Sequence, residues 1–218
     1  MESKKRLLAE SNLYLILDAA VNDPAELPRI ARTAGCAGAA PLQLRYKGGE
    51  GRDVLRLSRE ILAGMNPRTP FIVNDRADIC HAVGAAGVHL GQEDLPLPEA
   101  RRLLGDKYVI GASCQTIAQV RRAVAEGADY IGFGSVFKTL TKPDRSPMDL
   151  TLLEQVVRET PVPVYAIGGI TAENIDKLLA VGVTHFAVCR AICRAEDVTR
   201  AVTEFKGIIN PMMKVEHA

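Results

Sequence analysis

The sequence has 218 residues and a formal net charge of +1, with 47% hydrophobic and 24% charged residues, the composition of an ordinary globular protein. A net charge so close to zero gives no sign of the excess positive charge that binds nucleic acid or a membrane surface. The apolar run near the amino terminus is too short for a signal peptide or a membrane span. The five cysteines are scattered without a Cys-x-x-Cys pair, which fits reduced thiols better than a disulfide framework or a zinc site. We therefore expect a cytoplasmic protein with no nucleic-acid partner and no membrane partner.

Short β-rich apolar runs recur along the chain and alternate with amphipathic segments of helical spacing. The runs are residues 13–17, 41–45, 71–74, 86–90, 108–113, 129–134, 163–168 and 185–189. Near-continuous apolar strands alternating with helices predict a parallel sheet covered by helices. Eight such units suit a (β/α)8 TIM barrel, whereas an open doubly wound sheet usually carries a Gly-rich loop after its first strand, which is missing here. We predict an α/β protein with one TIM-barrel domain over 1–218 and a core of about 13–206.

The end of the second predicted strand carries polar side chains on one side. In a TIM barrel the functional residues lie at the carboxyl ends of the strands. Alternation places Gln43, Arg45 and Lys47 on the same side, facing the barrel interior or its mouth. Cations that point inward are costly unless an anion meets them. A solvated exit with outward-reaching side chains is an equally good interpretation of this segment alone.

Carboxylates follow the third and fourth predicted strands. Asn74 and Asp75 end the third strand, and Asp94 follows the fourth. Adjacent strands place these ends side by side, and Mg²⁺ takes one or two carboxylates, leaving its other positions to water and phosphate oxygens. The alternative is that Asp75 or Asp94 caps the following helix. We expect Arg76 and Asp78 at the start of the next helix.

The later strand ends suggest phosphate binding. Ser113, after the fifth strand, is either a polar contact at the rim or a helix N-cap, and the cap is favoured. The sixth strand leads into a long polar loop with hydroxyls and lysines, a composition that suits phosphate. Gly168 and Gly169 follow the seventh strand and would let backbone N–H groups approach an anion. Together the strand ends predict an enzyme that handles two phosphorylated small molecules, one of them bound to a metal.

Seven motifs at these strand ends resemble the thiamine-phosphate synthase family. In chain order they are QLRYK, FIVNDRAD, GVHLGQEDLP, GAS, GSVFKTLTKPD, AIGGIT and VCRAI, and the resemblance runs from about Leu13 to Ile192. It implies a transferase that joins 4-amino-2-methyl-5-(diphosphooxymethyl)pyrimidine to a thiazole phosphate, with or without a carboxylate, and releases pyrophosphate. The implied mechanism is dissociative: pyrophosphate leaves, and the thiazole nitrogen captures the resulting pyrimidine cation. A homodimer is also implied.

The resemblance assigns roles to individual positions. The metal ligands for Mg²⁺ would be Asp75 and Asp94. The positions implied for the pyrimidine and its diphosphate are Gln43, Arg45, Lys47, Asn74, Ser113 and Lys142. Those implied for the thiazole phosphate are Thr139, Thr141, Gly169, Cys189 and Arg190. The residues expected to act in the reaction itself are Arg45, Lys47, Ser113 and Lys142.

This sequence departs from the family pattern at three positions. The family usually has His where Gln115 stands, Pro where Ser135 stands and Ser where Arg190 stands. Arg190 is expected either to add a bidentate grip on the thiazole phosphate or to alter the acceptor. A related group, the thiazole tautomerases, relies on the missing His, so that alternative is disfavoured. A second alternative is a non-catalytic paralogue that binds a phosphorylated ligand and regulates.

Overall fold

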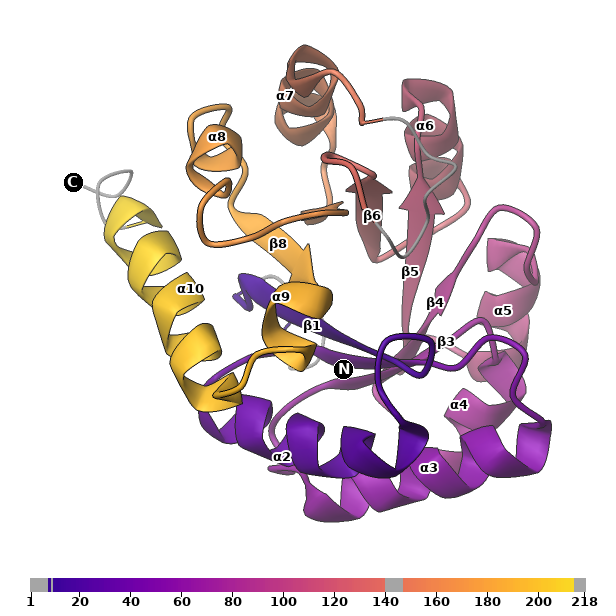
Figure 1. The fold of residues 1–218 in the computed structure, drawn as a ribbon. Helices are drawn as coiled ribbons and strands as arrows, with labels where there is room; N and C mark the ends of the chain where they lie inside the picture. Colours follow the sequence, from indigo (N-terminus) through magenta and orange to yellow (C-terminus); the bar gives the residue numbers. More distant parts are fainter. Residues whose placement is uncertain (1–7, 9, 140–146, 214–218) are drawn as a thin grey trace.

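Eight parallel strands close into a barrel in chain order, each paired with the next and β8 with β1 (Figure 1). The computed structural model describes residues 8, 10–139 and 147–213. The strands are β1 (Leu13–Asp18), β2 (Leu42–Arg45), β3 (Phe71–Asn74), β4 (Gly87–Leu90), β5 (Val109–Cys114), β6 (Tyr130–Gly134), β7 (Val164–Ile167) and β8 (His185–Val188). Each predicted apolar run overlaps one of these strands, and β1 and β5 each extend one residue beyond their runs. The predicted single-domain TIM barrel is therefore confirmed.

Helices surround the barrel and connect its strands (Figure 1). They are η1 (Pro24–Glu26), α2 (Leu27–Cys36), α3 (Gly51–Gly64), α4 (Ala77–Val83), α5 (Leu97–Leu104), α6 (Ile117–Ala125), α7 (Leu150–Glu159), α8 (Asp176–Leu179), α9 (Arg190–Cys193) and α10 (Val198–Met213). Helix α3 shows why they pack on the sheet: Val54, Leu57 and Ile61 share one face and are buried. Helix α6 begins where the Thr116 hydroxyl accepts the N–H of Gln119 at 3.2 Å.

The core has two layers. The larger layer lies between strands and helices, and a smaller one fills the barrel interior. In the interior, Tyr165 packs edge-on against Tyr14 and Tyr130, with ring centroids 5.1 and 5.6 Å apart. Gly111 makes room for this cluster, because a Cβ there would lie 2.1 Å from the Tyr130 ring.

Leu8 and Ser11, which precede β1, contact residues of the barrel interior. The Tyr165 hydroxyl hydrogen bonds to the carbonyls of Leu8 and Ser11 at 2.6 and 2.8 Å, and the Leu8 side chain is buried in the interior cluster. The carboxyl end of the barrel, where the strands finish, carries the functional site.

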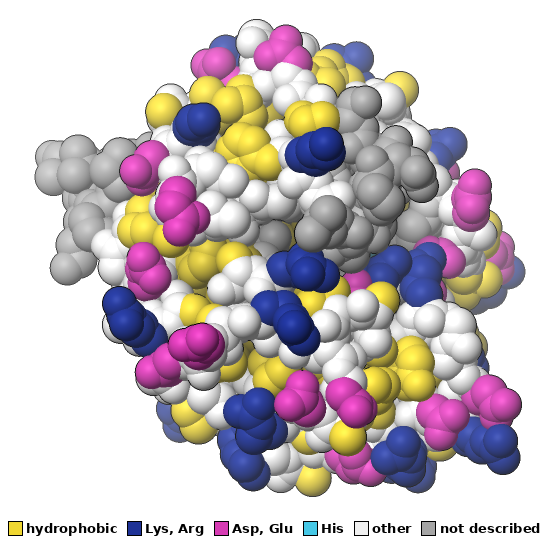
Figure 2. Space-filling model, in the orientation of Figure 1, with side chains coloured by type: hydrophobic (Ala, Val, Ile, Leu, Met, Phe, Trp, Pro, Cys, Tyr) yellow, Lys and Arg dark blue, Asp and Glu magenta, His cyan; other side chains and the backbone are white. Residues whose placement is uncertain are grey.

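The surface carries both signs of charge. On the face in Figure 2, Lys and Arg side chains gather near the centre, and acidic and basic groups are interspersed elsewhere. This agrees with the formal net charge of +1. Among the described helices, none is both long enough and apolar enough to cross a membrane.

Candidate active site

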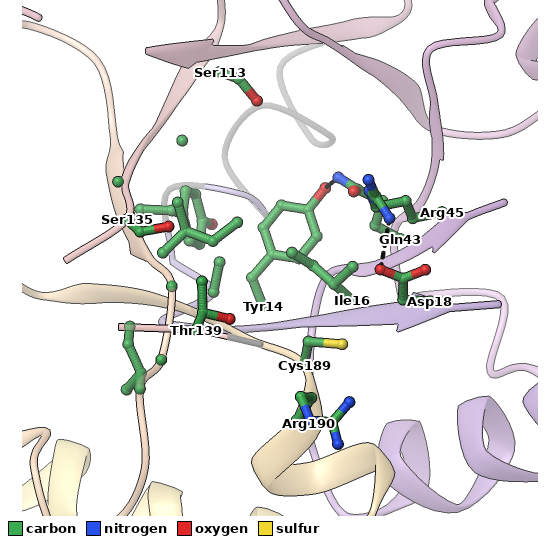
Figure 3. Close-up of a pocket in the computed structure, with 18 of the residues that line it drawn as sticks. Tyr14, Ile16, Asp18, Gln43, Arg45, Ser113, Ser135, Thr139, Cys189 and Arg190 are labelled. Atoms are coloured by element: carbon green, nitrogen blue, oxygen red, sulfur yellow. Dashed lines mark hydrogen bonds and ion pairs between the residues drawn. The ribbon is translucent and has the colours of Figure 1, made fainter. Parts of the chain in front are cut away.

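A cavity of about 430 Å³ opens at the carboxyl ends of the strands (Figure 3). Its walls come from strands all around the barrel and from the loops that follow β6, β7 and β8. The predicted site residues that line it are Gln43, Arg45, Asn74, Ser113, Thr139, Gly169, Cys189 and Arg190. The fold thus brings together residues that are up to 147 positions apart in the sequence (190 − 43).

Arg45 is already paired with a carboxylate inside the protein. Its Nη1 lies 2.7 Å from Asp18 Oδ2, and the two residues face each other in the β1–β2 register (Figure 3). The Asp18 side chain is only 1% exposed, and its other oxygen accepts the N–H of Ala20 at 2.9 Å. The inward cation therefore has an anion from the chain itself. Sequence reasoning missed Asp18, although a carboxylate that directly ends an apolar run is the signal that marked Asp75.

The side chain of Lys47 does not lie where the sequence predicts. Strand β2 ends at Arg45, so the alternation of strand side chains that predicts an inward-facing Lys47 stops two residues before it. Its side chain is 54% exposed and lies outside the cavity lining, with Nζ 3.0 Å from Asp75 Oδ2. Lys47 therefore belongs with the carboxylates at the rim and not with Gln43 and Arg45.

The carboxylates of Asp75 and Asp94 lie together at the rim beside Lys47. Burial, together with hydrogen-bonding and charge interactions with Asp94, raises the pKa of Asp75, while Lys47 opposes the rise. Asp75 has a φ of +63°, a strained conformation for a residue other than glycine, and its N–H donates to the His89 carbonyl at 2.8 Å. The adjacent strands thus hold the two acids close together, as the sequence predicted.

Neither rim carboxylate caps a helix. The N-cap of α4 is Arg76 and that of α5 is Pro96, so the capping alternative for Asp75 and Asp94 is wrong. Arg76 and Asp78 form an ion pair at the start of α4, with Arg76 Nη2 and Asp78 Oδ2 2.5 Å apart, which confirms their placement.

Ser113 is also not a cap. It lies inside β5, and the residue that caps α6 is Thr116. The favoured interpretation of Ser113 is therefore wrong, because β5 continues through Cys114 before α6 begins. Its side chain instead joins a hydrogen-bonded chain in the barrel.

A continuous chain of polar groups crosses the barrel interior. Gln43 Nε2 donates to the Tyr14 hydroxyl at 2.8 Å, and the Tyr14 and Tyr130 hydroxyls are 2.9 Å apart. Tyr130 is 3.0 Å from Nδ1 of His89, whose Nε2 is 2.9 Å from Ser113 Oγ. Burial raises the pKa of both phenols, so they stay neutral. The sequence analysis missed the two tyrosines and His89 because they lie within apolar runs.

The His89–Ser113 contact resembles the base and hydroxyl of a nucleophilic site, an arrangement that the sequence did not predict. The second nitrogen of this imidazole bonds to the Tyr130 phenol. In a nucleophilic triad that position is taken by a group that orients and stabilises an imidazolium. A neutral phenol supplies no such charge. The geometry therefore favours a positioning role for Ser113 over attack by its hydroxyl.

On the other side of the cavity, Thr139, Cys189 and Arg190 lie across from Ser113 (Figure 3). Gly169 also lines the cavity. Gly169 has a φ of +67°, and a Cβ there would lie 2.4 Å from the carbonyl oxygen of Lys138. This glycine lets the loops after β6 and β7 pack closely. Arg190 lines the cavity, and no ion pair joins it to another residue in the described part of the chain.

Four further predicted positions are Ser135, Gln115, Thr141 and Lys142. Thr141 and Lys142 lie outside the described residues. Ser135 is buried and lines the cavity. Gln115 is exposed, does not line the cavity, and donates its N–H to Gln119 Oε1 at 2.7 Å.

The donor set at the rim fits a magnesium ion. Within the described residues, no group of three or more His, Cys, Asp and Glu side chains is placed to hold a metal. Asp75 and Asp94 form a two-carboxylate set, which suits Mg²⁺ because this ion fills its remaining positions with water and phosphate oxygens. Two carboxylates would leave most of the ion's coordination positions to ligands from outside the protein.

The fold and the site define a TIM-barrel enzyme whose cavity is lined by apolar side chains together with polar and cationic groups, beside a pair of rim carboxylates. The sequence pattern of the family described as thiamine monophosphate synthase matches residues 13–192. The chain belongs to this family, and it is a transferase.

Individual relatives agree with this assignment. The chain is 41% identical over 201 residues to a thiamine-phosphate synthase of Methanocella arvoryzae, covering 91% of this chain and 95% of that protein. It is 40% identical to one of Gloeobacter violaceus, where it spans 93% of this chain but only 59% of that protein. A solved structure of thiamine phosphate pyrophosphorylase from Pyrococcus furiosus has a TM-score of 0.85 and 33% identity, covering 94% of this chain and 98% of that one.

Proposed function

We propose that this chain is a thiamine-phosphate synthase that joins 4-amino-2-methyl-5-(diphosphooxymethyl)pyrimidine to a (carboxy)thiazole phosphate and releases pyrophosphate, together with carbon dioxide where the thiazole carries a carboxylate. The observation that carries the proposal is the carboxylate pair Asp75–Asp94, which lies with Lys47 at the rim of the same barrel end as the cavity. Two charged carboxylates placed this close together cost free energy, as the raised pKa of Asp75 shows, so their placement does not serve stability alone. They suit a cation that carries a diphosphate.

Asp75 and Asp94 would hold Mg²⁺. When bound there, the ion would neutralise charge on the departing diphosphate. Lys47, 3.0 Å from Asp75, can add its own charge to the same group. Lys142 has the same role in this proposal, on the family resemblance alone.

The pyrimidine would occupy the part of the cavity lined by Gln43, Asn74 and Ser113. Gln43 is fixed by its bond to Tyr14, and Ser113 by its bond to His89, so both polar groups are oriented before substrate binds. Arg45, held by Asp18, contributes positive charge at the same wall without moving. These residues bind and orient the substrate.

A dissociative route agrees with this inventory. Departure of pyrophosphate leaves a cation on the pyrimidine methyl group, and the thiazole nitrogen forms the new bond with its own electron pair. The step needs no protein nucleophile and no strong base. Its requirements are charge stabilisation on the leaving group and positioning of the acceptor, for which Arg45, Lys47, Ser113 and Lys142 are the proposed catalytic residues.

The thiazole phosphate would bind on the opposite side of the cavity. Thr139, Gly169 and the Cys189 backbone line that side, and Thr141 joins them in the proposal by resemblance. Arg190 adds a guanidinium, which can grip a phosphate with two parallel N–H donors. This grip is a feature of this chain, since the family usually has Ser at that position.

The proposal includes a cytoplasmic location and a homodimer. All five cysteines are free thiols in the structure, in keeping with a reducing compartment. The expected partners are small phosphorylated substrates, with no nucleic acid or membrane. Sedimentation of the purified chain tests the homodimer, and a monomer at all concentrations would contradict it.

The activity is tested with purified protein and both substrates, with and without Mg²⁺. Thiamine phosphate and pyrophosphate should form in equal amounts, and only with the metal present. No product, or product that forms equally well in a chelator, would refute the proposal.

A further inference from the structure

Gln92 and Arg122 connect the β4–α5 loop, the end of β5 and helix α6, although neither residue lines the cavity. Gln92 belongs to the loop between β4 and α5, which carries Asp94, and its Nε2 donates to the Ser113 carbonyl at 2.6 Å. Arg122, on α6, donates from Nη2 to Gln92 Oε1. One amide thus joins the loop of a proposed metal ligand to the end of β5 and to a surface helix.

The loop that carries Asp94 folds tightly on itself. The N–H of Gly91 donates to Asp94 Oδ2 at 2.6 Å, and the Asp94 N–H donates to the Gly91 carbonyl at 3.3 Å. A Cβ at residue 91 would lie 2.7 Å from that carboxylate oxygen. The position of Asp94 therefore depends on where residues 91 and 92 lie against the barrel.

The chemistry of the partners fixes the orientation of the Gln92 amide. A guanidinium only donates and a carbonyl only accepts, so Arg122 must face the amide oxygen and Ser113 must face the amide nitrogen. The neighbouring Cys114 does not compete as an anion for Arg122, because burial raises the pKa of its thiol to about 12. With both ends satisfied, the amide has one favoured orientation.

We propose that Gln92, oriented by Arg122, is a positioning residue that holds the Asp94 loop against β5 and so keeps Asp94 beside Asp75 for metal binding. The inference rests on the proposed function, because it assigns Gln92 a purpose at the proposed Mg²⁺ site. The same amide fixes the Ser113 backbone, while His89 fixes the Ser113 side chain. One residue outside the cavity thereby sets the distance between the metal ligands and the proposed pyrimidine contact.

The variants separate positioning from general surface effects. Gln92→Met keeps the length of the side chain and the net charge but removes both hydrogen bonds. Arg122→Met removes the bond that orients the amide, whereas Arg122→Lys retains a donor and should rescue. Arg121→Met is the charge-matched control, because Arg121 lies on the same helix and pairs with Glu159 at 3.5 Å, away from Gln92.

The measurement is Mn²⁺ binding to the intact protein in the presence of pyrophosphate, followed by electron paramagnetic resonance and without turnover. We expect Gln92→Met to weaken Mn²⁺ binding by about threefold to tenfold, the net worth of one or two hydrogen bonds. Arg122→Met should weaken it by less, and Arg122→Lys and Arg121→Met should bind as the parent does. The KM for the thiazole phosphate should not change in Gln92→Met.

The outcomes distinguish a failure of the positioning role from a failure of the proposed function. If the parent protein binds Mn²⁺ and folded Gln92→Met binds it equally well, the positioning role is wrong and the proposed function stands. If Arg121→Met weakens binding as much as Arg122→Met does, the effect is one of surface charge, and the role of Arg122 is refuted. If the parent binds no Mn²⁺ with pyrophosphate present, both the metal site and the positioning role fail.

Discussion

The substitution Asp18→Asn tests how the buried charge of Arg45 is balanced. Asparagine keeps the shape of the side chain and an oxygen that can accept the N–H of Ala20. Its NH₂ group replaces Oδ2, which accepts from Arg45 Nη1 at 2.7 Å. The change therefore removes one charge-assisted hydrogen bond and leaves a guanidinium without its anion.

The magnitude follows from the exposure of the two partners. Removing one partner of a fully buried ion pair costs about 3–5 kcal/mol. Asp18 is 1% exposed but Arg45 is 16% exposed, so water can partly solvate the orphaned charge. We expect the free energy of unfolding to fall by about 2–4 kcal/mol, which for a protein of this size lowers Tm by roughly 2–4 °C for each kcal/mol.

The assay is urea unfolding of the parent and the variant at neutral pH. Asp23→Asn is the matched control: Asp23 lies in the connection that follows β1, is exposed, and accepts the N–H of Ala25 at 2.9 Å, a bond that asparagine can keep. Its cost should stay within about 0.5 kcal/mol. If Asp18→Asn costs no more than this control, the ion pair does not balance Arg45, and the description of this wall is wrong.

The proposed binding site and the buried phenols give two further predictions. Arg190→Ser should raise the KM for the thiazole phosphate at least tenfold, about the worth of one charge-assisted hydrogen bond. The KM for the pyrimidine should not change, and an equal effect on both KM values contradicts the assignment. The folded-state pKa of Tyr14, Tyr130 and Tyr165 is raised, so their contribution to stability is present below the unfolded value of about 10 and is lost as pH rises above it. Urea unfolding between neutral and alkaline pH should show this loss, and a Tyr14→Phe variant should lose less; identical slopes would refute the effect.

The barrel could be predicted from the sequence because its signals are local. Each strand is a short apolar run, and parallel strands buried on both faces must alternate with helices. Asp75 and Asp94 could be paired for the same reason, since carboxyl ends of neighbouring strands meet at one rim. These inferences needed only the order of elements along the chain.

The errors concern features that depend on contacts across the barrel. The pairing of Arg45 with Asp18 could not be predicted, because the two residues are 27 positions apart in sequence. Ser113 looked like a cap because the end of β5 could not be located to within two residues. His89 and Tyr130 lie within apolar runs, and only the closed barrel places them 3.0 Å apart. The periodicity of hydrophobic residues along the chain carries no information about contacts between side chains on different strands.

The most direct test of the central claim is a crystal structure with Mg²⁺ and pyrophosphate bound. The account predicts a metal ion held by the carboxylates of Asp75 and Asp94, with the pyrophosphate beside Lys47 at the mouth of the cavity. A metal ion bound elsewhere, or pyrophosphate bound away from these residues, would contradict it.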